Sequence, residues 1–365
     1  MSDQPTQHLP VFHEEDAFAG WPANNGIWRY GNEILVGFIL AKHKDTDGHS
    51  YDNETARRMF ARSVDGGESW VIEDAFEAGM SGQAHNHRIG AKAKEPVDCP
   101  DSLDFTHPGF ALTFDRANNA DGPTSFHYSY DRGHSWTGPF VFPNFDTAGV
   151  AARTDYIVDG PHSMMVFLTA AKSDHREGRV LCAETVDGAR SWTKLSWIGP
   201  EQDGYAIMPA SVRLTKSEIL VVIRRKTSDR AWLDAYRSAD NGRSWQPLDE
   251  PAGDLGGGNP PAMIRLTDGR VCLAYGVRNR PRYEGDVPHS QMCVRFSPDG
   301  GKSWGEQIVV RGGDGANWDM GYPRMVQRPD GKVVLIYYYN HALLDGPPFR
   351  YIAATIFDPR SLQAS

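Results

Sequence analysis

Several histidine, arginine, tyrosine and asparagine side chains could carry acid–base chemistry on an anionic substrate. His87 and His107 lie 20 residues apart, so one imidazole could accept a proton while the other, or a tyrosine such as Tyr322, donates one. Arg153, helped by Asn259, could neutralise a carboxylate by preorganised charge. Together these residue types suit removal of a proton beside a carboxylate, followed by departure of an oxygen leaving group.

A second group of side chains offers guanidinium or amide donors to a substrate. Arginine binds a carboxylate through two parallel hydrogen bonds, which makes it the natural partner for an acidic ligand. The predicted substrate-binding residues are Asn24, Asn259, Arg224, Arg225, Arg278 and Arg324. The alternative is a solvated rim, in which nearby acidic residues such as Asp45 balance these cations.

A metal centre is a further alternative for the histidine-rich stretch. His85, His87 and Cys99 carry side chains that bind zinc, but their spacing matches no specific zinc pattern. Histidines beside arginines are better suited to proton transfer. We therefore predict neither a metal nor a cofactor.

The overall composition limits the partners of the chain. A net charge of −9 over 365 residues disfavours a general nucleic-acid or anionic-membrane surface, because phosphate binding needs clustered cations. No apolar run reaches the roughly 18 residues of a membrane helix. The N-terminus lacks the basic and apolar regions of a signal peptide, which indicates a cytoplasmic protein, or a secreted or periplasmic one whose signal has been removed.

A repeat of the form Ser/Thr-x-Asp-x-x-x-Ser-Trp organises the chain. In each copy the Asp can accept hydrogen bonds from its own turn, and the Trp is expected to be buried. Successive copies lie 53 to 66 residues apart, a period typical of propeller blades. The five copies are Ser63–Trp70, Ser129–Trp136, Thr185–Trp192, Ser238–Trp245 and Ser297–Trp304.

This repeat predicts an all-β, six-bladed β-propeller that forms a single domain over residues 1–365. Seven blades are the alternative, because residues 77–103 could hide further strands. Residues 10–15 are expected to complete the last blade and so remove an exposed sheet edge. The predicted blades cover residues 24–76, 104–146, 153–200, 205–252, 258–311 and 320–358.

The residue that opens the innermost strand of each predicted blade should point toward one common mouth. These positions hold Asn24 or Asn25, His107, Arg153, Met208, Asn259 and Tyr322. Proline follows in four of them, where it is tolerated at the first position of a strand. Polar side chains at equivalent strand starts are unusual for a sealed core, so we expect them to converge on a site.

The five repeats are Asp boxes, and the chain resembles the sialidase (BNR/Asp-box) superfamily over nearly its whole length. Exo-sialidases of that superfamily use three arginines, a Tyr–Glu nucleophile pair and an Asp acid. Tyr322 falls where the tyrosine is expected, and Arg324 with one of Arg224, Arg225 or Arg278 could bind a carboxylate. However, Trp21–Gly26 holds no arginine where the family has its first one.

The candidate site residues look more like those of ulvan lyase and rhamnosyl-glucuronate lyase propellers. That resemblance implies two histidines about 20 residues apart, with Arg, Tyr and Asn nearby, and β-elimination at a uronate sugar. We therefore expect an enzyme that cleaves an acidic oligosaccharide or polysaccharide by elimination. Sialidase-like hydrolysis through acids such as Asp155 and Asp319, or glycan binding without catalysis, are the alternatives.

Overall fold

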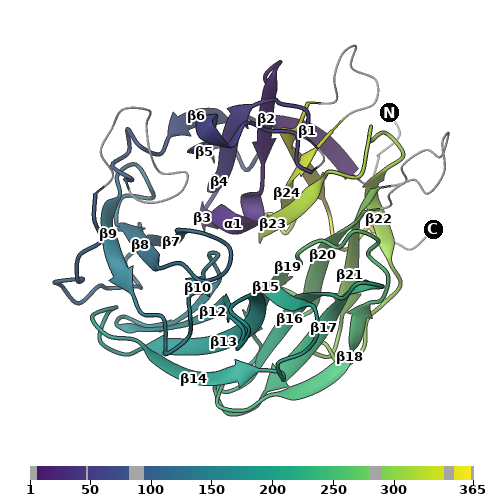
Figure 1. Cartoon of the computed structure of the whole chain (residues 1–365). Helices are drawn as coiled ribbons and strands as arrows, with labels where there is room; N and C mark the ends of the chain where they lie inside the picture. Colours follow the sequence, from purple (N-terminus) through teal and green to yellow (C-terminus); the bar gives the residue numbers. More distant parts are fainter. Residues whose placement is uncertain (1–5, 47, 82–93, 279–289, 341–348, 363–365) are drawn as a thin grey trace. The chain divides into compact units, whose positions relative to one another are not determined.

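The computed structural model describes residues 6–46, 48–81, 94–278, 290–340 and 349–362. Within these ranges the regular structure is almost entirely β-strand, in six antiparallel sheets (Figure 1). The two helical segments are the short α1 (Pro22–Asn25) and a 3-10 turn at Asn53–Thr55. The six sheets confirm the predicted all-β, six-bladed propeller fold. No helix in the described part of the chain is long and apolar enough to cross a membrane.

The chain divides into two compact units, which are described separately. The first unit comprises Met1–Glu73, Arg230–Trp232 and Ala252–Ser365. The second unit comprises Asp74–Asp229 and Leu233–Pro251.

The first unit holds three of the sheets. One contains β2 (Ala17–Gly20), β3 (Ile27–Tyr30), β4 (Glu33–Lys42), β5 (Arg57–Ser63) and β6 (Val71–Asp74). The next contains β19 (Ala262–Arg265), β20 (Val271–Val277), β21 (Gln291–Ser297) and β22 (Ile308–Gly312). The third contains β23 (Gly321–Gln327), β24 (Val333–Tyr339), β25 (Tyr351–Phe357) and β1 (Thr6–Phe12).

The N-terminal strand completes the last sheet, as predicted. β1 pairs antiparallel with β25, from Thr6 opposite Phe357 to Phe12 opposite Ile352. It covers Thr6–Phe12 rather than residues 10–15, with a register shift between Pro10 and Phe12. This pairing covers what would otherwise be an open sheet edge.

The second unit holds most of the other three sheets. One contains β7 (Ala111–Arg116), β8 (Thr124–Ser129) and β9 (Thr137–Phe142). The next contains β10 (Val150–Ala151), β11 (Tyr156–Gly160), β12 (Ser163–Ala171), β13 (Glu177–Thr185) and β14 (Thr193–Ile198). The last contains β15 (Tyr205–Arg213), β16 (Ile219–Lys226), β17 (Ala231–Ser238) and β18 (Gln246–Ala252).

The sheet of β7, β8 and β9 differs from the prediction. Its Asp box joins β8 to β9, so β7 is the second strand of the usual four-strand meander and not the first. The start of β7 lies at the Asp-box end, where Ala111 pairs with Ser129. His107 precedes this strand in a turn, in which the Phe110 amide donates to the His107 carbonyl. The prediction that a strand begins at His107 is therefore wrong.

All five Asp boxes are built by the same hydrogen bonds. Each Asp carboxylate accepts from the hydroxyl two residues before it, at 2.7–2.9 Å, and from the serine hydroxyl four residues after it, at 2.5–2.6 Å. Bonds from Ser244 and Ser303 lower the pKa of Asp240 and Asp299, respectively, to about 2. The carboxylates accept hydrogen bonds from groups of their own turns, so we assign the Asp boxes a structural role.

The box tryptophans are less buried than we expected. Only Trp136 is fully buried, with 5% of its surface exposed, while Trp70, Trp192, Trp245 and Trp304 are partly exposed. The Trp136 indole donates to the Gly133 carbonyl and its backbone amide to Ala78. The cost of removing a box tryptophan should therefore depend on which one is removed.

Trp136→Ala should lower the free energy of unfolding by about 3–5 kcal/mol, since a fully buried indole is replaced by a cavity. Chemical denaturation monitored by circular dichroism measures this loss. Trp304→Ala is the matched control, because Trp304 holds the same place in a different box and is partly exposed. A loss at Trp304 as large as that at Trp136 would contradict the assignment of the effect to burial.

Stability should fall steeply in acid. The folded carboxylates of Asp240 and Asp299 keep their charge down to about pH 2, whereas unfolded aspartates protonate near pH 3.9. Their stabilising contribution is thus complete above about pH 4 and disappears as the pH falls toward 2. Urea unfolding across this range should show the decline, with a shallower slope in Asp240→Asn. A stability that does not change with pH below about 4 would refute this linkage.

Candidate functional site

In the first unit, polar and aromatic side chains gather where the first strand of each sheet begins and where the second strand ends. His49 comes from the β4–β5 connection and Arg278 directly follows β20. Asp319 and Tyr322 come from the entry into β23, and Tyr338 from the end of β24. Direct contacts join these five residues, so the first unit builds a candidate site from three sheets.

Asp319 is the centre of this cluster. Its side chain is fully buried, and its Oδ1 accepts a hydrogen bond from the Tyr338 hydroxyl at 2.5 Å. The same oxygen lies 2.6 Å from His49 Nδ1, while Oδ2 accepts from Arg350 Nε at 3.0 Å. Burial alone would raise the pKa of Asp319, but the bond to His49 and the charges of Arg278 and Arg350 lower it to about 2. Asp319 is therefore an ionised anchor.

His49 contacts Asp319 through only one of its two ring nitrogens within the described ranges. Nδ1 contacts Asp319, and Nε2 has no hydrogen-bond partner among the residues that the structure describes. The side chain is 28% exposed and packs edge-on against Trp21, with Trp318 6.0 Å away between ring centroids. A carboxylate on Nδ1–H orients the imidazole and leaves the Nε2 lone pair free to accept a proton.

Arg278, a predicted substrate-binding residue, reaches the same cluster. Its Nε donates to the Met320 carbonyl at 2.7 Å and its Nη2 to the Tyr338 hydroxyl at 2.5 Å. Nη1 has no partner within the described ranges. Because the other two nitrogens are fixed, the direction of this donor is fixed as well. Burial raises the pKa of Tyr338 well above its usual value, so its phenol stays neutral beside the guanidinium.

Tyr322 lies close to both Arg278 and Tyr338. Its ring centroid is 5.3 Å from the Arg278 guanidinium carbon and 5.9 Å from the Tyr338 ring. His49 and Tyr322 thus both flank Tyr338, since the His49 ring lies 6.4 Å from it. The first unit places an imidazole, a guanidinium and a phenol around one buried tyrosine.

The other predicted residues of the first unit make mainly structural contacts. Asn259 is fully buried, and its amide bonds to backbone groups of Met320 and Tyr322. Arg324 Nη2 donates to the Ala23 carbonyl in α1. Asn24 is 7% exposed, and its backbone amide donates to the Trp21 carbonyl.

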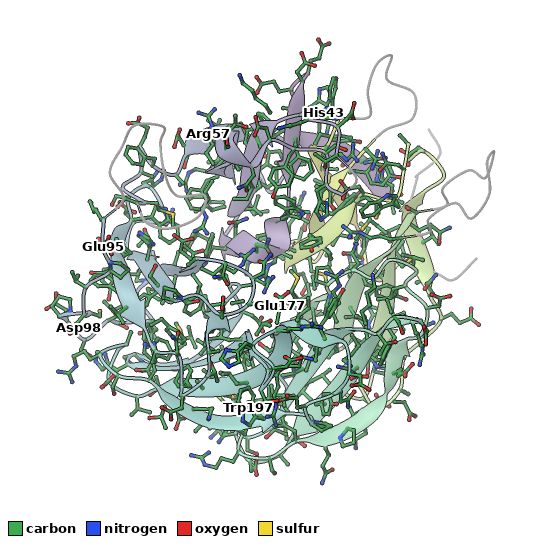
Figure 2. The ribbon with its side chains drawn as sticks, in the orientation of Figure 1. His43, Arg57, Glu95, Asp98, Glu177 and Trp197 are labelled. Atoms are coloured by element: carbon green, nitrogen blue, oxygen red, sulfur yellow. The ribbon has the colours of Figure 1, made fainter. Side chains whose placement is uncertain are left out.

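In the second unit, the predicted arginines lie at the corresponding strand ends and are held by neighbours. Arg153 lies between β10 and β11 and forms an ion pair of 2.8 Å with Glu177, whose side chain is labelled in Figure 2. Arg225 pairs with Asp234 at 3.2 Å, and Arg224 Nη1 contacts the Met208 sulfur at 4.0 Å.

His107, one of the two predicted catalytic histidines, is not part of either group. His107 is exposed at the Asp-box end of its sheet, and its ring packs against Tyr130 at 4.8 Å. It lines a shallow cavity of about 350 Å³ with Arg132 and His134. His87, like His85, lies outside the described residues.

The sequence patterns do not indicate His49, and they indicate Asp319 only as a possible acid for hydrolysis. The sequence does indicate that both residues stand in connections that lead to the same strand ends, and this could have suggested that they lie close together. No group of three metal-binding side chains occurs in the described part of the chain.

Comparisons with known proteins agree with the fold. Residues 121–335 match the BNR repeat-like domain. The chain belongs to this family. The predicted resemblance to sialidase-superfamily propellers is thus confirmed. No curated protein matches the sequence significantly.

Solved structures similar to this BNR-repeat protein include several glycosidases. A protein of unknown function from Dyadobacter fermentans is 17% identical, with a TM-score of 0.70, covering 96% of this chain and 98% of that one. The NanB sialidase from Streptococcus pneumoniae is 12% identical, with a TM-score of 0.57 and coverages of 99% and 71%. An α-L-arabinanase from Penicillium chrysogenum is 12% identical, with a TM-score of 0.56 and coverages of 98% and 100%. These similarities concern the fold.

Proposed function

We propose that this protein is a carbohydrate-active enzyme that cleaves the glycosidic bond at a uronate sugar by β-elimination. The observation that carries the proposal is the His49–Asp319 pair, whose free ring nitrogen lies in the same cluster as Arg278 and Tyr322. Elimination requires a base, a group that neutralises the carboxylate and an acid for the leaving oxygen. These three side chains can supply the three roles.

The reaction assigns one step to each side chain. His49 Nε2 removes the C5 proton, whose electron pair forms the C4–C5 double bond while the C4–O bond breaks. The Tyr322 phenol gives its proton to the departing oxygen. Exchange with water then returns a proton to Tyr322 and removes one from His49, so the enzyme is restored.

The surroundings favour charge development in this reaction. The carboxylate of Asp319 stabilises the imidazolium that forms on His49. Arg278 Nη1 would bind the substrate carboxylate, while Met320 and Tyr338 hold the other two guanidinium nitrogens. A preorganised cation of this kind makes the C5 proton more acidic without reorganisation during the reaction.

This proposal moves the base from His107 to His49. His107 lies at the Asp-box end of its sheet, away from the strand ends that carry the predicted arginines of its unit. The roles of His87 as a proton donor and of Arg153, Arg224 and Arg225 in substrate binding stay predictions. Arg153 would have to share its guanidinium between Glu177 and a substrate.

Hydrolysis by two carboxylates is less well supported. A catalytic pair needs one carboxyl that can donate a proton and another that can attack or activate water. Asp319 is fully buried, ionised and bonded to Tyr338 and Arg350 as well as His49. Asp155 belongs to the second unit, where Oδ1 accepts a bond from the Ser211 amide. The similarity to sialidase and arabinanase structures supports a glycan substrate without favouring hydrolysis.

A substrate panel tests the proposed substrate class. Uronate polysaccharides, sialosides and neutral arabinan would be incubated with the enzyme and assayed for new reducing ends. We expect cleavage of a uronate glycan only, and no cleavage of the same glycan after its carboxyl groups are reduced to alcohols. Comparable cleavage of arabinan would refute a carboxylate-binding site, and binding without cleavage would indicate a non-catalytic glycan-binding protein.

A further inference from the structure

The turn that carries Tyr322 has an unusual backbone. Tyr322 has a φ of 53° and Gly321 a φ of 109°, and Pro323 follows. A side chain larger than that of Asn or Asp is rarely found at positive φ, so neighbouring groups must hold this conformation. The entry into β23 shows a matching irregularity in its pairing with β24, between Gly321 and Arg324.

The Asn259 side chain holds this turn from both sides. Oδ1 accepts a hydrogen bond from the Tyr322 amide at 2.8 Å, and Nδ2 donates to the Met320 carbonyl at 2.9 Å. The fit is close, since a Cβ on Gly321 would lie 2.0 Å from Nδ2. Asn259 is fully buried, so its amide is enclosed by the turn and is not presented to solvent.

The same turn also fixes Arg278. The Met320 carbonyl accepts both the Asn259 amide and Arg278 Nε, the latter at 2.7 Å. Arg278 is also held by the Tyr338 hydroxyl at 2.5 Å, so its position does not depend on Asn259 alone.

The second unit contains the same kind of turn with a different side chain. Met208 has a φ of 53°, precedes Pro209, and donates its amide proton to the Thr169 hydroxyl at 2.9 Å. A methionine has no acid–base role. This second turn is therefore a natural control, because it needs the same backbone support without presenting a reactive group.

We propose that Asn259 is a positioning residue, which sets Tyr322 in place and does not bind the substrate. The inference rests on the proposed function only through Tyr322 as the acid. It replaces the substrate-binding role that the sequence suggested for Asn259.

Steady-state kinetics of four variants tests this role. Asn259→Ala should lower kcat by about 10- to 100-fold, since a displacement of about 1 Å costs that much, and should change KM by less than about threefold. Tyr322→Phe should also lower kcat. If Asn259 acts through Tyr322, the double variant should be scarcely slower than Tyr322→Phe alone. Thr169→Ala should lower the melting temperature yet leave kcat unchanged.

The outcomes separate this inference from the proposed function. A raised KM with unchanged kcat in Asn259→Ala would mean a substrate contact, and fully multiplicative losses in the double variant would mean independent action. Either result would overturn the positioning role alone. A wild-type rate in Tyr322→Phe would instead refute Tyr322 as the acid. If Asn259→Ala does not fold, Asn259→Asp keeps the acceptor for the Tyr322 amide and should retain more activity than a Tyr322→Phe enzyme.

Discussion

His49→Gln should lower the rate of uronate glycan cleavage by about 10²- to 10⁴-fold, the usual contribution of a positioned general base. Glutamine can still donate a hydrogen bond toward Asp319, so the buried carboxylate keeps a partner and the fold should survive. However, an amide nitrogen has no lone pair that can accept the C5 proton. Initial rates with the wild-type enzyme and the variant at equal concentrations measure the effect.

Two other histidines provide the controls. His43 opens the same β4–β5 connection and contacts Asp45 and Phe349 outside the Asp319 cluster (Figure 2), so His43→Gln should keep its activity. His107→Gln tests the sequence-based expectation that His107 is the general base. A full rate in His49→Gln together with a large loss in His107→Gln would return the base to His107 and contradict our assignment.

Arg278→Lys should lower cleavage of a carboxylated glycan by about 10²- to 10³-fold, comparable with removal of a preorganised catalytic donor. The guanidinium contacts the Met320 carbonyl and the Tyr338 hydroxyl with two nitrogens, and in the proposed reaction Nη1 would bind the substrate. A single ammonium group cannot satisfy these three directions together. Because lysine keeps the positive charge, a loss of activity would reflect the changed hydrogen-bond geometry more than a change in charge.

Arg265→Lys is the matched control, because Arg265 is exposed on β19 of the same sheet. Its kinetics should equal those of the wild-type enzyme. An Arg278→Lys enzyme with unchanged kcat/KM would show that the guanidinium only supports the buried cluster. The carboxylate would then have to be bound by another residue.

The fold was predictable because the Asp box is a local signal. Each box satisfies its hydrogen bonds within seven consecutive residues, so the residues that form it can be recognised without knowing the rest of the structure. The sixth sheet has no box, and it was inferred from β-strand patterns and the need to cover its edge. β1 meets that need.

The candidate site was harder to predict because its bonds join distant parts of the chain. His49 and Asp319 are separated by 270 positions, and nothing near either residue indicates the other. The rule that places the predicted site residues at first-strand starts is confirmed for Tyr322, the second residue of β23, whereas Arg153 lies between β10 and β11. The rule failed for His107, because β7 is a second strand. Asn259 was predicted to lie near the start of its first strand, and it does. The sequence cannot show, however, that its side-chain amide is hydrogen-bonded to backbone groups.

The ratio of double bonds to new reducing ends is the most direct test of the elimination mechanism. Elimination leaves a C4–C5 double bond conjugated with the carboxylate, which absorbs in the near ultraviolet without any reagent. In one digest of a uronate glycan, absorbance and reducing ends would be quantified together, with His49→Gln as the blank. Our account predicts one unsaturated residue for each bond cleaved. New reducing ends without this absorbance would contradict elimination and leave hydrolysis as the reaction.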